Sequence, residues 1–447
     1  MALATVRTTA GLGRFFILAV LGLFVASLLT SCGGGRVSES GQPPQAKSRR
    51  GGLPPGGRAG GGGPTVPAGE TAKVALLLPM TGTYGKLGTA MRQAAELALF
   101  DIAGKTFTLT PIDTGGTPEG ARRAAQQAKA GGVHLILGPL LSSSVSAVKA
   151  EIGDGDINVV AFSTDSGVAG GNVFLMGFLV KPQIDRIVAY ANKQGLKRIA
   201  VVAPEGPYGQ AVVDAFAQAV QATGVQNAGT LLYPAGTADM TKVFRSFTNY
   251  NARASALLRV MARTRGKTDA ASRRARAKAR RSIKIPPPAW DAVIIADGGA
   301  RLLLAGSLLA FYDVDPDKVQ YLGTGQWDDE SVGQEPNLKG GWFAAPPPSS
   351  RATFEAKFKS QFKTDPPRIA TLAYDAVALA AVLARSEGGA NFSREAIGSA
   401  NGFVGIDGIF RFLPSGLSER GLAVLEVAEG EFRMIGTAPG TFETRTE

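Results

Sequence analysis

The sequence predicts an α/β protein made of two doubly wound parallel-sheet lobes joined by a hinge. Short apolar segments without polar alternation are separated by Ala-rich helical segments from residue 71 onward, which is typical of parallel sheets covered on both faces. The alternation starts again near residue 182. The segment 71–447 is also longer than one hydrophobic core usually supports. These three observations favour two lobes.

The strands and helices follow from the apolar pattern. In the first lobe we expect strands at 73–78, 106–112, 133–137 and 157–162, and helices at 89–100, 118–129 and 144–152. In the second we expect helices at 182–194, 209–223 and 301–311, and strands at 197–204, 229–233, 290–297 and 319–325. The expected boundaries are lobe 1 at 71–181 and 347–404, lobe 2 at 182–346, and C-terminal strands at 405–447 that complete the lobes.

The N-terminal segment 1–31 is predicted to be an export signal. Two arginines and no acid precede the uncharged run FFILAVLGLFVASLL, which is too short for a typical membrane-spanning helix. The following LTSC resembles the lipobox of bacterial lipoproteins, which implies lipid attachment at Cys32 and a periplasmic location. Gly33 resembles the sorting pattern for the inner leaflet of the outer membrane. The alternative is a chance cysteine at the end of an ordinary signal.

Residues 32–70 are predicted to be a tether. From residue 33 to 70 there are 13 Gly and 6 Pro, a composition that resists regular structure. A flexible coil of this length spans roughly 30–35 Å. Because Cys32 is the only cysteine, no intrachain disulfide can form.

Histidine and cysteine, two residue types that many enzymes use for catalysis, each occur once in this chain. His134 is the only histidine and lies in an apolar strand, where a half-buried structural role is expected. A Ser-His-Asp triad would need a histidine in a polar site, and a zinc centre would need Cys or further His ligands. Asp328 and Asp329 are interpreted as a solvated turn or helix cap. We therefore expect no catalytic residues, no metal, no cofactor and no enzymatic activity.

The loop TGTYGKLG carries glycines at 82, 85 and 88 between a strand and a helix. The spacing GxxGxxG differs from the dinucleotide motif GxGxxG, although Asp113 could serve as a ribose ligand. Export also argues against a nucleotide cofactor. The preferred interpretation is a tight turn with close packing of the helix on the strand.

Six segments in order resemble the type I periplasmic binding proteins, over about residues 72–432. They are VALLLPMTGTYGKLG, LILGPLLSSSV, VVAFSTDS, IAVVAPEGPYGQ, YLGTGQWDD and TLAYDAVALAA. The resemblance implies a cleft between the lobes that could hold a small molecule. The candidate cleft residues are Tyr84, Ser142, Ser143, Ser163, Thr164, Asp165, Tyr208, Asp297 and Gln326.

Only half of the amino acid clamp of that family is matched. Ser142 and Ser143 match its first-lobe serines, and Tyr208 matches its second-lobe tyrosine. Asp165-Ser166-Gly167 and Gly325-Gln326 depart from the threonine and the ammonium-binding acid that the family pattern expects. Serines at a helix start are also ordinary N-caps, so a structural role for Ser142–Ser144 stays open.

Two branches of the family therefore remain as interpretations. The lipid anchor, the tether and the LLLPMTG opening resemble the penicillin-binding protein activators, which implies docking to a peptidoglycan synthase. The alternative is a lipid-anchored receptor that delivers an amino acid to the permease of an ABC transporter.

A basic insertion is predicted at 253–284. It holds 12 Lys or Arg against one acid, Asp269, and so accounts for +11 of the formal net charge of +12. Alanine and arginine favour a helix here. The alternatives are a solvated basic helix and an electrostatic contact with an anionic surface; nucleic acid is not expected, because no aromatic residues interleave and the chain is exported. The central cations are Arg273, Arg274, Arg276, Lys278, Arg280 and Arg281.

Overall fold

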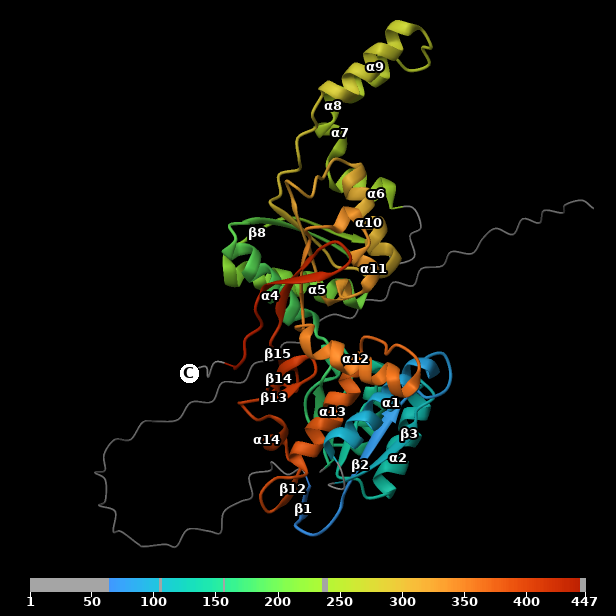
Figure 1. The fold of residues 1–447 in the computed structure, drawn as a ribbon, viewed down its shortest axis with the longest axis vertical. Helices are drawn as coiled ribbons and strands as arrows, with labels where there is room; N and C mark the ends of the chain where they lie inside the picture. The colour runs from blue at the N-terminus through green and yellow to red at the C-terminus, as the bar shows by residue number, and fades with distance from the viewer. Residues whose placement is uncertain (1–63, 104–106, 156, 235–239, 443–447) are drawn as a thin grey trace, which may run out of the picture. The chain divides into compact units, whose positions relative to one another are not determined.

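The computed structural model describes residues 64–103, 107–155, 157–234 and 240–442 (Figure 1). The predicted signal peptide, Cys32 and residues 32–63 of the predicted tether lie outside the described residues. Within the described residues, no helix is both long enough and apolar enough to cross a membrane.

The first lobe is built on a five-stranded parallel sheet. The strand order is β3-β2-β4-β5-β6, which is a doubly wound arrangement in which loops at the carboxyl ends of the strands form a binding edge. The strands are β2 (Ala72–Leu78), β3 (Phe107–Asp113), β4 (Leu135–Leu137), β5 (Asn158–Ala161) and β6 (Val173–Leu175).

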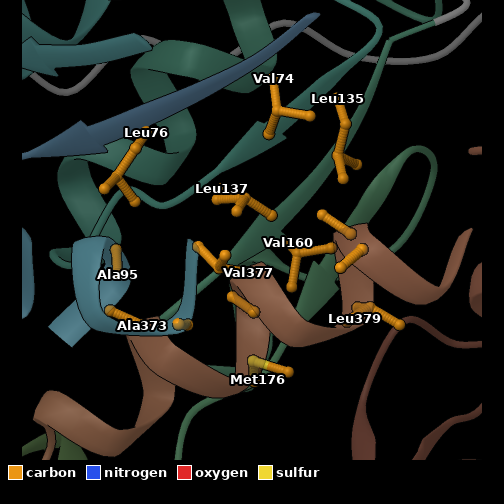
Figure 2. Close-up of a cluster of buried hydrophobic side chains, with 14 of the residues drawn as sticks. Val74, Leu76, Ala95, Leu135, Leu137, Val160, Met176, Ala373, Val377 and Leu379 are labelled. Carbon is orange, nitrogen blue, oxygen red and sulfur yellow. The ribbon is translucent and has the colours of Figure 1, made fainter. Parts of the chain in front are cut away.

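Helices cover both faces of this sheet because β2, β4 and β5 are apolar on both sides. One core joins the sheet to α1 (Gly85–Ala98), α12 (Ser349–Phe362) and α13 (Ala370–Leu383). Figure 2 shows Ala95 of α1 and Val377 of α13 in one cluster with Leu76, Leu137 and Val160 of the sheet. The opposite core joins the sheet to α2 (Pro118–Ala130) and α3 (Ser142–Ile152).

The second lobe is built on a seven-stranded sheet of order β17-β16-β11-β10-β9-β7-β8. β7 to β11 pair in parallel, and β16 and β17 extend the sheet antiparallel. The predicted fold class, two doubly wound lobes, is confirmed, and the antiparallel edge is an addition to it. The strands are β7 (Arg198–Pro204), β8 (Gln226–Tyr233), β9 (Ala292–Ile295), β10 (Gln320–Gly323), β11 (Trp342–Ala345), β16 (Ala423–Val427) and β17 (Phe432–Gly436).

Two cores flank this second sheet. One is formed with α4 (Val180–Lys193) and α5 (Pro207–Thr223). The other is formed with α6 (Thr241–Phe247), α10 (Gly299–Phe311) and α11 (Glu330–Gly333). The apolar runs of the parallel strands therefore bury both of their faces, as the sequence pattern requires.

The chain passes between the lobes three times. The crossings follow β6, follow β11 and precede β16. The third crossing leaves a separate antiparallel sheet of β13 (Phe403–Gly405), β14 (Gly408–Phe412) and β15 (Ser418–Arg420). Phe410 and Phe412 of β14 pack in the core of the first lobe. Arg420 thus ends β15 at the point where the chain returns to the second lobe.

The structure corrects the boundary of the predicted tether. Residues 65–67 form β1 (Thr65–Pro67), which pairs antiparallel with β12 (Gly389–Asn391). Val66 is buried in the core of the first lobe. Prolines are tolerated on such an edge strand because it needs few backbone donors. Residues 64–70 therefore belong to the folded body, although their composition resembles the rest of the tether.

His134 lies just before β4 and is half-buried. Its Nδ1 accepts a hydrogen bond from the backbone N–H of Lys73 at 3.0 Å. Burial lowers the pKa of its imidazole, so the neutral form that accepts this bond is favoured. This is the structural role that the sequence suggests, at the amino ends of the strands and away from the binding edge.

The glycine loop after β2 forms a tight turn held by Asp113. The Asp113 carboxylate accepts hydrogen bonds from the N–H groups of Met80 and Gly115, both at 2.8 Å, and from the Thr81 hydroxyl at 2.5 Å. Burial raises the pKa of Asp113, but these hydrogen bonds outweigh it and lower the pKa overall. A Cβ at Gly88 would lie 2.2 Å from the carbonyl oxygen of Pro79. Asp113 and Gly88 therefore serve the turn and the packing of α1.

We expect Gly88→Ala to lower the free energy of unfolding by about 3 kcal/mol, because the added methyl group must displace rigid backbone. Gly440→Ala is the control, since a Cβ there meets nothing within 4 Å. Urea unfolding of both variants measures the effect. Equal stability of the two variants would contradict the close-packing role.

Candidate functional site

A cavity of about 470 Å³ opens among loops of both lobes. Its size is typical of small-molecule sites. Thr164, Arg368 and Ile369 come from the first lobe, Tyr208, Gly298 and Gln326 from the second, and Phe178, Pro346 and Arg420 from the crossings. The cavity therefore lies where the binding edges of the two sheets and the crossings meet.

A second cavity of about 350 Å³ lies against the first lobe. It shares Thr164, Phe178 and Ile369 with the larger cavity, so the two are adjoining parts of one cleft. The N-terminus of α3 contributes Ser142 to its wall. We refer to the larger space as the interlobe cavity.

The structure places most of the sequence-predicted residues on these two cavities. Tyr84, Ser142, Ser163 and Asp165 line the smaller one, Thr164 lines both, and Tyr208 and Gln326 line the interlobe cavity. Ser143 is exposed on α3 and lines neither.

Asp297 lies behind the wall of the interlobe cavity and is only 2% exposed. Its Oδ1 accepts the N–H of Gly298 at 2.8 Å and its Oδ2 accepts Arg301 Nε at 3.0 Å. The hydroxyl of Tyr233 also donates to it. These bonds fix the loop that starts α10, so Asp297 supports the wall and does not line it.

Tyr208 is held as a neutral phenol. Burial raises the pKa of its hydroxyl to about 12. The hydroxyl lies 3.0 Å from the Thr324 hydroxyl. Tyr208 therefore presents an uncharged polar group to the cavity.

Each carboxylate that lines the two cavities has at least one hydrogen bond or ion pair within the protein. Asp165 Oδ1 accepts the N–H of Gly167 at 3.0 Å. Asp329 caps α11 by accepting the N–H of Ser331 at 2.9 Å. Asp328 is buried and binds two arginines, which corrects the interpretation of Asp328 as a solvated turn residue. Among the described residues, no cluster of His, Cys, Asp and Glu is placed to hold a metal ion.

A chain of buried charges runs from Asp328 into the first lobe. Asp328, which follows β10, pairs with Arg351 of α12 and with Arg368 Nε at 2.7 Å. Arg368 Nη2 also pairs with Asp407 at 2.9 Å, and the Thr371 hydroxyl donates to Asp407 at 2.6 Å. The charged residues Asp328, Arg351, Arg368 and Asp407, together with Arg420 and Asp375, are called the charged cluster. The ion pairs of Asp328 with Arg351 and Arg368 join the two lobes.

Arg420 belongs to the same cluster but has no ion-pair partner within 4.0 Å among the described residues. Its Nη2 donates to the carbonyl oxygen of Met176 at 2.7 Å, which ties the third crossing to the first. Its guanidinium lies 5.0 Å from the ring centre of Phe178 and 5.2 Å from that of Phe410. Burial lowers its pKa.

Asp375 lies inside α13 with one carboxylate oxygen unbonded. Its Oδ1 accepts the N–H of Ile406 at 2.7 Å. Burial, and next the neighbouring Asp407 carboxylate, raise the pKa of Asp375 to about 7. The sequence signal for it was an aspartate inside the apolar helix TLAYDAVALAA. Arg351, Arg368, Asp407 and Arg420 carry no such local signal.

The basic insertion folds as a helical arm between α6 and β9. It comprises α7 (Tyr250–Arg253), α8 (Ser255–Arg263) and α9 (Ala270–Ser282), and α8 and α9 extend away from the lobe (Figure 1). Arg253 fixes its base by donating to the carbonyl oxygens of Thr248 and Pro286 at 3.0 and 2.8 Å. Arg276 of α9 joins α9 to the end of α8 by donating to the carbonyl oxygen of Thr264 at 2.7 Å.

The other ten cations of the arm are exposed, and none forms an ion pair with a described residue. They are Arg259, Arg263, Arg265, Lys267, Arg273, Arg274, Lys278, Arg280, Arg281 and Lys284.

Two sheets of this topology around an interlobe cavity define the class of two-lobed binding proteins. The model of the periplasmic binding protein family matches residues 71–413, more than half of the chain. The chain belongs to this family.

Curated relatives carry two kinds of name. The penicillin-binding protein activator LpoA of Glaesserella parasuis is 32% identical over 148 residues, which cover 32% of this chain and 24% of that protein. The Leu/Ile/Val-binding protein BraC3 of Rhizobium johnstonii is 28% identical over 163 residues, 34% of this chain and 44% of that protein. The chain thus matches less than half the length of either relative.

Solved structures resemble most of the chain. The leucine-binding protein LivK of Thermotoga maritima aligns with a TM-score of 0.55 at 19% identity, covering 82% of this chain and 99% of that one. A putative branched-chain amino acid ABC transporter protein of Rhodospirillum rubrum aligns with a TM-score of 0.63 at 17% identity, covering 82% and 100%. At these identities the likeness shows the fold.

We expect Asp328→Asn to lower the free energy of unfolding by roughly 3 kcal/mol, because Arg351 would lose its buried partner and Arg368 one of two. The neighbouring Asp329→Asn is the matched control. Asp329 is exposed, and asparagine caps a helix almost as well as aspartate, so its effect should stay below about 1 kcal/mol. Urea unfolding of the two variants tests this, and equal losses would show that the cross-lobe ion pairs contribute little.

The raised pKa of Asp375 predicts a stability that depends on pH. The folded protein keeps this proton up to about pH 7, whereas the unfolded chain releases it near pH 4, so this group makes stability fall as pH rises between those values. Asp375→Asn should remove that fall. The difference in unfolding free energy, variant minus wild type, should grow by on the order of 3 kcal/mol from pH 4 to 7. A constant difference across this range would contradict the buried neutral carboxyl.

Proposed function

We propose that this chain is a non-enzymatic periplasmic lipoprotein, anchored through Cys32, that docks to a peptidoglycan synthase and regulates it. The outer membrane is the proposed site of anchoring. Two of the curated relatives carry the name penicillin-binding protein activator. The arm of α8 and α9 is the structural observation that carries the docking proposal.

The arm suits recognition of an acidic protein surface. Its ten exposed cations have no ion-pair partner in the described part of the chain, so they are available to another molecule. Few of its side chains are buried: Ala254, Thr264, Ser272 and Ala279. Such a surface supports rapid, salt-sensitive association with a partner of opposite charge.

A binding role without catalysis fits the chemistry of the cleft. A general base must present an unengaged group at the reacting position. Among the cavity-lining carboxylates, Asp328 is committed to ion pairs and Asp165 and Asp329 each accept a backbone N–H through Oδ1, and the Tyr208 phenol is neutral at physiological pH. His134 lies at the opposite ends of the strands.

A second candidate function is a receptor that hands a small molecule to an ABC transporter permease. The interlobe cavity of about 470 Å³ favours it, as does the likeness to a Leu/Ile/Val-binding protein. The two functions differ in what they require of the chain. Docking through the arm should depend on the charges of the arm, whereas a receptor depends on a ligand bound in the cavity.

The docking proposal is tested by the triple variant Arg273→Gln, Arg274→Gln, Lys278→Gln. Loss of three exposed charges should reduce recovery of a peptidoglycan synthase after in-cell crosslinking by about tenfold, since each surface ion pair contributes about 0.5 kcal/mol. In a pull-down with the wild-type protein, a higher salt concentration should also reduce the recovery of the synthase.

The control removes the same charges from the first lobe. Arg122→Gln, Arg123→Gln, Lys129→Gln replaces two arginines and one lysine that are exposed on α2. This variant should keep wild-type recovery. Equal recovery of both triple variants would remove the arm from the docking proposal, and recovery of a permease in place of a synthase would favour the receptor.

A further inference from the structure

We propose that α10 of the second lobe is a contact face on which a second copy of this chain packs antiparallel to the first. This inference goes beyond the docking proposal, because it concerns neither a synthase nor a ligand in the cleft. It holds whether the chain acts on a synthase or on a permease.

α10 is apolar on all sides, although the lobe covers only one of them. Arg301 is the single charged residue of this 13-residue helix. Leu302, Ala305 and Leu309 are fully buried in a core of the second sheet. A helix that is apolar all round is expected to be buried all round. The described residues leave the outward face of α10 without such a cover.

The outward face carries one apolar stripe. Ala300, Leu304, Ser307 and Phe311 follow one another at intervals of four, three and four residues, which aligns them along the helix. Phe311 is 71% exposed and Leu304 is 37% exposed. An exposed stripe of this kind marks an interaction surface more readily than single apolar residues do.

The fold itself does not require an apolar outward face. α5 packs in the core on the other side of the same sheet, and its outward face is polar. The exposed polar residues of α5 are Gln210, Asp214, Gln218 and Gln221. The stripe of α10 therefore needs an explanation outside the single chain.

The stripe is complementary to itself about a two-fold axis. When two copies of α10 lie antiparallel about its midpoint, Phe311 of one copy faces Ala300 of the other. Leu304 faces Ser307 in the same arrangement, because both pairs are centred between residues 305 and 306. Each large side chain thus meets a small one, which lets the two helices approach closely. The two-fold axis repeats both contacts.

The charges at the two ends of α10 match in the same direction. Arg301 lies near the N-terminal end; it pairs with Asp297, and its side chain is still 45% exposed. Asp313 follows the C-terminal end, is exposed, and forms no ion pair with a described residue. Antiparallel packing brings the Arg301 end of one copy to the Asp313 end of the other. It also opposes the two helix dipoles.

The basic arms favour this direction as well. The base of the arm lies at the C-terminal end of α10, where the ring centres of Tyr250 and Tyr312 are 5.1 Å apart. Arg253 donates there to the carbonyl oxygen of Tyr312 at 3.1 Å. An antiparallel pair therefore has its two arms at opposite ends. A parallel pair would bring like charges together.

Sedimentation of the purified full chain tests the pairing. One chain has a mass of 46.2 kDa, and the mean mass should rise toward twice this value at about 100 µM, since a small interface is weak. Phe311→Ser should raise the dissociation constant by about tenfold or more, because the axis makes the loss count twice. Phe100→Ser is the matched control, since Phe100 is 85% exposed in the first lobe. This control should dimerise as the wild type does.

Ala300→Leu separates the paired arrangement from general apolar adhesion. The larger side chain would occupy the space that Phe311 of the second copy fills. Dimerisation should therefore weaken by about fivefold or more, although the apolar surface of the stripe increases. General adhesion would give tighter association instead, which would contradict the proposal.

Thiol crosslinking tests the antiparallel register. In the background Cys32→Ser, the variants Ala300→Cys and Phe311→Cys each have one thiol per chain. A short bismaleimide should join the two variants when they are mixed. It should not join Ala300→Cys to itself, because in this register the two thiols lie about 16 Å apart along the helix axis.

Three results would overturn the proposal: a monomer at about 100 µM, a dimer that Phe311→Ser leaves intact, and crosslinks between like variants in place of unlike ones. These assays use the purified protein alone. Their failure leaves the recovery of a synthase through the arm unaffected, so the two proposals fail independently.

Discussion

The ion pairs of Asp328 with Arg351 and Arg368 join the two lobes beside the cavity. The carboxylate comes from the loop after β10 in the second lobe, and both guanidinium groups come from the first. A buried carboxylate needs such partners, because desolvation without them costs several kcal/mol. The Gly298–Gly299 and Gln326 loops and the first-lobe residues Thr164, Arg368 and Ile369 line the interlobe cavity beside this contact.

The same ion pairs determine the charge of the cavity wall. Arg351 and Arg368 both pair with Asp328, and Arg368 also pairs with Asp407, so two arginines balance these two acids without Arg420. The third carboxyl, Asp375, has its pKa raised to about 7 by burial and by Asp407. The cluster therefore carries a cation that its own acids do not pair.

Local patterns predicted the sheets well, because strands that are buried on both faces have nearly unbroken apolar sequences, such as KVALLL and AVVA. They also located the strand-end loops that carry Thr164, Tyr208 and Gln326 on the cavity wall. They could not find Arg420 or Arg368, whose partners Met176 and Asp328 lie 244 and 40 residues away. Asp297 was misplaced because a strand-end acid can face the cavity or brace the loop behind it. β1 was missed because Val66 is one apolar residue between prolines.

The arm and the cavity represent different uses of the second lobe. The cavity is formed by loops that the fold itself brings to the strand ends, whereas the arm is an insertion between β8 and β9 that adds few buried side chains. Arg253 anchors its base on the lobe through backbone carbonyls, so the base is held without using any exposed cation. A segment that contributes little to the core but nearly all of the net charge is best explained by what it contacts outside the chain. We therefore propose that the charge of the arm serves association with a partner, whereas the cavity is the proposed place of a small-molecule ligand.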